Sequence, residues 1–135
     1  MSADFAAFMT DALDLAHPPA EGVKAMFHAY LTYWRKHPCA FRFNQWRQMA
    51  GPADEWQARS ELMARNGVVF MQMAQKAGFI RKDVPPGLAL IFGGSAIQFW
   101  LHSQIEVRDA LSISGGAKLS EDAFLEHILR LLRAA

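Results

Sequence analysis

The chain has 135 residues, 52% of them hydrophobic with ten Phe, four Trp and seven Met, and a formal net charge of +1. Its length predicts one domain, residues 1–135, and its scattered Lys and Arg argue against a nucleic-acid-binding surface. The single cysteine, Cys39, excludes an internal disulfide and the first residues lack a signal peptide, so we expect a cytoplasmic protein.

Proline and glycine divide the first part of the chain into four predicted helices. Each has apolar residues at helical spacing, and Ser2 is the expected cap of the first. The fourth is the longest, and Gly78 closes it at a position that normally needs a left-handed conformation. These helices cover about residues 2–15, 20–36, 38–49 and 53–77.

A fifth predicted helix lies in a stretch without charge, Pro85–Ile105. Its apolar run, Leu88–Leu101, is shorter than the about 20 residues that span a bilayer. Such a helix needs cover on nearly every side, from its own domain or from another chain. Ala89, Gly93 and Ala96 lie on one side, where small residues permit the close approach of another helix. The helix is either a central core helix or, as we favour, one shared with a dimer partner.

The last predicted helix follows Ser120, a suitable cap. Its apolar residues cover an arc of about 160°, whereas a helix that rests on one core needs about 100°. The excess indicates a second neighbour, so we predict that this helix and the uncharged helix form a dimer interface. The expected interface residues are Ala89, Gly93, Ala96, Trp100, Leu125, Ile128, Leu129 and Leu132.

No alternation of period two persists along the sequence, so strands are not predicted. The expected fold is all-α, an antiparallel helical bundle of about six helices with short loops.

The motifs that carry catalysis or bind metals are absent from the sequence. No two histidines are four residues apart, and no glycine-rich phosphate loop or nucleophile motif occurs. We therefore expect no enzyme activity, no cofactor and no metal. The alternative is a metal site assembled from residues that are distant in the sequence. His102 either bonds a backbone carbonyl near its helix end or contacts a ligand.

The helices between residues 20 and 102 are rich in aromatic and methionine side chains, which are typical of apolar pockets between the helices of a bundle. For each such residue, plain core packing is the alternative. We expect a cavity lined by Phe27, Tyr30, Trp46 and Phe70. The full set of predicted ligand-binding residues is Phe27, Tyr30, Trp34, Phe43, Trp46, Met63, Phe70, Gln98, Phe99 and His102.

Three segments resemble the C-terminal regulatory domain of TetR-family transcriptional repressors. They are AYLTYWRKHP at 29–38, AGFIRKDVPP at 77–86 and FLEHILRLLR at 124–133. The resemblance implies a homodimeric bundle in which the last two long helices of each chain make a four-helix dimer interface. It also implies that the bundle binds a small apolar or amphipathic effector. The family binds DNA through an N-terminal helix-turn-helix that is missing from this sequence. We therefore expect no DNA binding by this chain alone. The alternative is a free-standing helical protein-interaction module without a small-molecule ligand.

Overall fold

The computed structural model describes residues 3–12, 19–51, 54–115 and 118–134, and within them the chain is all-α. The predicted cap at Ser2 and the break before Pro19 lie outside these residues. The seven helices are α1 (Ala3–Ala12), α2 (Pro19–Lys36), α3 (Pro38–Ala50), α4 (Asp54–Lys76), α5 (Pro86–His102), α6 (Gln104–Ile113) and α7 (Glu121–Leu132).

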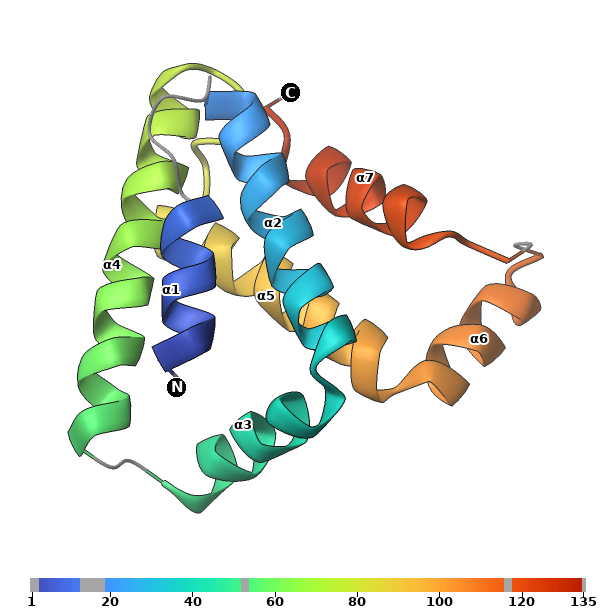
Figure 1. The fold of residues 1–135 in the computed structure, drawn as a ribbon. Coiled ribbons are helices and arrows are strands. Elements are labelled where there is room, and N and C mark those ends of the chain that lie inside the picture. The colour runs from blue at the N-terminus through green and yellow to red at the C-terminus, as the bar shows by residue number, and fades with distance from the viewer. Residues whose placement is uncertain (1–2, 13–18, 52–53, 116–117, 135) are drawn as a thin grey trace.

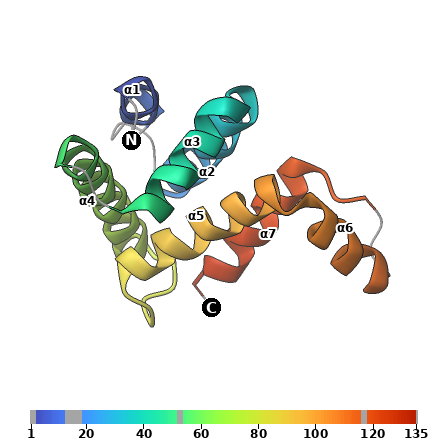
Figure 2. The same cartoon turned by 90° about the horizontal axis from the view of Figure 1, so that it is seen from below.

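Helices α2 and α5 cross at the centre of the molecule, with α1 and α4 on one side and α7 on the other (Figures 1 and 2). Within the described residues α3 packs only on α2, and α6 packs only on α5. Both therefore project from the end of the bundle where α2 and α5 finish, as Figure 1 shows. None of the described helices is long and apolar enough to cross a membrane.

The structure corrects the expected helix number, because the uncharged stretch holds the end of one helix and the start of another. Helix α5 ends at His102, and Ser103 leaves helical geometry with φ −116° and ψ 47°. The Ser103 hydroxyl hydrogen-bonds the Nδ1 atom of His102 over 2.7 Å. The break at Ser103 ends α5, and a new helix, α6, begins at Gln104.

Other predicted boundaries are confirmed. Helix α4 is the longest, with 23 residues, and Gly78 follows it with φ +84°. Ser120 caps α7 by accepting a hydrogen bond from the Ala123 backbone N–H over 3.1 Å. These boundaries depend on residues next to the helix ends, which is why the sequence alone predicted them.

Three glycines allow α2, α4 and α5 to pack closely in a ring. A Cβ atom on Gly22 of α2 would lie 2.7 Å from Phe70 of α4. One on Gly67 of α4 would lie 2.8 Å from Leu90 of α5. One on Gly93 of α5 would lie closer than 3.0 Å to the Phe27 ring of α2. Each helix thus supplies one glycine and receives one large side chain, which explains why glycine is kept inside three helices despite its low helix propensity.

Polar contacts hold α7 against this central unit. Lys24 of α2 and Glu126 of α7 form an ion pair of 2.5 Å, and Arg35 of α2 pairs with Glu121 of α7. At the other end, the Arg81 backbone N–H donates to the Leu132 carbonyl over 2.8 Å. The connector between α4 and α5 and the end of α7 are therefore fixed together.

Candidate functional site

An open-sided cavity of about 270 Å³ lies between α1, α2, α4 and α5. All four helices contribute to its walls, and most of the side chains are apolar. The lining residues are Phe5, Met9, Met26, Phe27, Tyr30, Ser60, Met63, Ala64, Gly67, Leu90, Ile91 and Gly94. A cavity of this composition suits the apolar body of a small molecule.

The cavity exists because α5 presents a glycine to it. A Cβ atom added to Gly94 would have no neighbour within 4 Å, so the space beside this residue is empty. Met9, Met26 and Met63 come to the same space from three helices. Their unbranched thioethers can change conformation at low cost, so the walls can adapt to ligands of different shape.

Tyr30 gives the cavity one polar group. The Gln98 side-chain amide donates a hydrogen bond of 2.7 Å to the Tyr30 hydroxyl oxygen. Burial raises the pKa of the Tyr30 phenol above its ordinary value, so the group is neutral at physiological pH. Because its oxygen already accepts from Gln98, the phenol O–H can donate to an acceptor on a ligand.

The structure brings only part of the predicted ligand-binding set to this cavity. Phe27, Tyr30 and Met63 line it, and Gln98 reaches it through the Tyr30 hydroxyl. Trp34 and Phe70 are instead core residues, 2% and 3% exposed. Trp34 stacks on Phe5 with ring centroids 4.5 Å apart, and Phe70 occupies the space above Gly22.

The remaining predicted ligand residues lie on the surface. Phe43 and Trp46 neighbour each other on α3, with centroids 5.8 Å apart, and are 48% and 58% exposed. Phe99 and His102 meet edge to face at the outer end of α5 and are also exposed. The expected cavity therefore lacks Trp46 and Phe70, because α3 packs on α2 alone and Phe70 is used to join α2 to α4.

Sequence reasoning missed the contribution of α1. Phe5 and Met9 are four residues apart on one face of this helix, 1% and 4% exposed, and both line the cavity. Their helical spacing identified a buried face. That this face closes the space between α2 and α4 depends on how α1 docks, which its own sequence does not specify.

Most residues predicted for the dimer interface are covered by their own chain. Ala89 is fully buried, and Gly93 faces Phe27 of α2. Leu125, Ile128 and Leu132 belong to the core, and Ala96, Trp100 and Leu129 are partly buried against it. The small-residue side of α5 does permit close approach, but the helix that approaches is α2 of the same chain.

A neighbouring side of α5, about a quarter turn from Ala89 and Gly93, is only partly covered by the described residues. Leu88, Phe92 and Phe99 are 39%, 51% and 49% exposed, and Leu131 of α7 is 75% exposed. We call these four residues the outer apolar face. An open cavity of about 280 Å³ between α5 and α7 is lined by Phe92 and Leu131 and continues this face. Exposed large apolar side chains that gather in this way are a candidate interaction surface.

Among the described residues, no three His, Cys, Asp or Glu side chains come together as a possible metal site. Comparisons of the chain with protein-family models, with curated proteins and with solved structures find no match. The apolar cavity and the outer apolar face are the features on which we base the proposed function.

Proposed function

We propose that this chain is the effector-sensing and dimerising domain of a TetR-like transcriptional regulator. The cavity between α1, α2, α4 and α5 carries the proposal, because it joins an adaptable apolar space to one hydrogen-bond donor. The ligand it suits is small and apolar with a single acceptor group. The segments that resemble the family fall at the α2–α3 junction, the α4–α5 connector and α7, in the order the resemblance implies.

The same cavity supports a sensing role. Helices α1 and α4 both line it, and the described residues of these helices also pack on each other. A ligand that fills the space changes the preferred position of α1 relative to α4. Such a shift needs different ligand affinities for the two arrangements, and the adaptable methionines make two arrangements accessible.

The second half of the proposal is that two copies cover each other's outer apolar face. Leu88, Phe92 and Phe99 follow one side of α5 at helical spacing, and Leu131 adds the neighbouring α7. The interface we now propose therefore uses the side of α5 next to the one that carries Ala89 and Gly93. In the family, the corresponding helices of two chains form a four-helix contact.

Filling the cavity from Gly94 tests the ligand site. We expect the neutral fluorophore N-phenyl-1-naphthylamine to bind the wild-type chain and Gly94→Ala with similar affinity. Gly94→Leu should place its side chain in the empty space and lower that affinity at least tenfold, with an unchanged helical circular-dichroism spectrum. Equal binding to all three proteins would refute the ligand site.

One observation favours a second candidate, a helical protein-interaction module. Phe43, Trp46 and Met49 expose apolar surface on α3, away from the cavity. A module of this kind would bind another protein through α3 and would show no affinity for apolar small molecules. The same fluorophore titration separates the two functions.

A further inference from the structure

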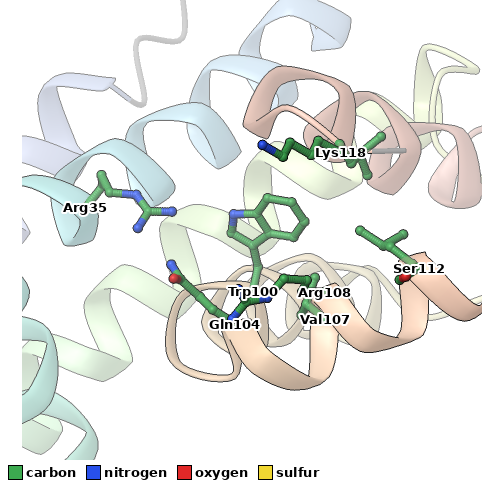
Figure 3. A pocket seen from close by; sticks show the side chains of 9 residues that line it. Arg35, Trp100, Gln104, Val107, Arg108, Ser112 and Lys118 are labelled. Atoms are coloured by element: carbon green, nitrogen blue, oxygen red, sulfur yellow. The ribbon is translucent and has the colours of Figure 1, made fainter. Parts of the chain in front are cut away.

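A second and larger groove, of about 570 Å³, lies where α6 turns away from α5 and the chain returns to α7. Figure 3 shows the Trp100 indole at its centre, with the side chains of Arg35, Arg108 and Lys118 around it. The lining residues are Arg35, Trp100, Gln104, Val107, Arg108, Leu111, Ser112, Lys118 and Leu119. None of them lines the apolar cavity, so the two sites are separate.

The floor of the groove is apolar and fixed in place. Trp100 stacks on Phe124 of α7, with ring centroids 4.2 Å apart and an interplanar angle of 15°. Val107 and Leu111 of α6 and Leu119 before α7 complete this surface. The volume is in the range of small-molecule sites, about 300–1,000 Å³.

The rim of the groove is cationic. Three of the lining residues are Arg or Lys and none is Asp or Glu. Arg35 is paired with Glu121, whose carboxylate lies 3.5 Å from the Trp100 indole nitrogen. Arg108 and Lys118 have no ion-pair partner among the described residues. Two cations without an ion-pair partner among the described residues thus face the apolar groove, and the Glu121 carboxylate beside it is already paired with Arg35.

We propose that this groove binds a small amphipathic anion, a carboxylate on an apolar chain or ring. The carboxylate lies between Arg108 and Lys118, and the apolar part lies on Trp100 and Leu111. Charge complementarity selects this ligand class, because hydrogen bonds between ionised partners are about twice as strong as neutral ones. The apolar cavity, whose lining residues carry no charge, suits uncharged molecules instead.

The test uses the full chain and decanoate at a concentration below micelle formation, followed by calorimetry and by Trp fluorescence. We expect decanoate to bind at least tenfold more tightly than decanol or decyltrimethylammonium, which have the same chain length. Arg108→Gln/Lys118→Gln should weaken decanoate at least tenfold. The charge-matched control Lys76→Gln/Lys82→Gln removes two exposed cations outside the groove and should change the affinity less than twofold.

Two further variants locate the bound decanoate. Trp100→Phe should abolish most of the fluorescence response, because the Trp100 indole lines the groove. Gly94→Leu, which fills the apolar cavity, should leave decanoate binding intact. Loss of binding in Gly94→Leu, or equal affinities for the anion, the alcohol and the cation, would overturn the assignment. The N-phenyl-1-naphthylamine titration tests only the apolar cavity, and decanoate binding tests only the groove. A negative result at one site therefore leaves the other proposal standing.

Discussion

Gly93 and Gly94 are adjacent in α5, and the structure predicts opposite effects when each is replaced by alanine. Both sit in a helix interior, where Gly→Ala gains about 1 kcal/mol from helix propensity. A methyl group at Gly94 enters open space, so Gly94→Ala should raise the free energy of unfolding by about that amount. A methyl group at Gly93 meets the Phe27 ring closer than 3.0 Å, a distance that real Cβ atoms do not show.

The difference between the two variants isolates the packing cost at Gly93, because the gain in propensity is common to both. Phe27 is 3% exposed, so its ring can retreat only toward the apolar cavity that it lines. Overpacking of this kind costs about 1–3 kcal/mol. We therefore expect Gly93→Ala to be less stable than Gly94→Ala by about 1–3 kcal/mol. It should also bind apolar ligands less well, because the displaced ring occupies their space.

Urea unfolding followed by circular dichroism measures this difference, at one protein concentration because self-association stabilises the folded state. Phe27→Leu removes the ring atoms that meet the methyl group. In that background, Gly93→Ala should lose most of its cost, which appears as a coupling energy in a double-mutant cycle. If Gly93→Ala proves as stable as Gly94→Ala, α2 and α5 are not packed as described.

Three other predictions concern α1, α7 and the outer apolar face. Phe5→Ala should lower the free energy of unfolding in urea by about 3–5 kcal/mol, or by less if only α1 detaches. Phe8→Ala should lower it far less, because Phe8 is partly exposed. Equal losses for the two variants would contradict the docking of α1. Lys24 lowers the pKa of the Glu126 carboxyl below its ordinary 4.5, so this pair stabilises the fold above that pH and loses its effect as the pH falls through the folded-state pKa. The melting-temperature difference between wild type and Glu126→Gln should thus be positive at pH 7 and shrink as the pH falls through the folded-state pKa of Glu126. The exposed Glu106→Gln of α6 should show no such trend. Phe92→Glu and Leu131→Glu should each reduce the mass measured by light scattering to that of one 15.1 kDa chain. Leu62→Glu, on the exposed side of α4, is the control and should leave the mass unchanged. A wild-type mass of 15.1 kDa would refute the dimer.

The candidate site was only partly predictable. Phe27, Tyr30 and Met63 were identified because aromatic and methionine residues favour pockets. The same criterion also selected Trp34, which packs on Phe5, and Trp46, which is exposed. Composition marks residues that can line a pocket, whereas the space itself arises where α1, α2, α4 and α5 fail to fill the gap beside Gly94.

The sequence by itself determined most of the helices and several of their ends, because proline, left-handed glycine and serine caps act within a few residues. It did not separate α6 from α5. Pro38 starts α3, Gly78 follows α4 and Ser120 caps α7, as expected. Only the tertiary structure decided which side of α5 is buried. A helix that is apolar on nearly every face has no periodicity to distinguish its sides, so the fit of Phe27 over Gly93 made that choice and left Phe92 and Phe99 exposed.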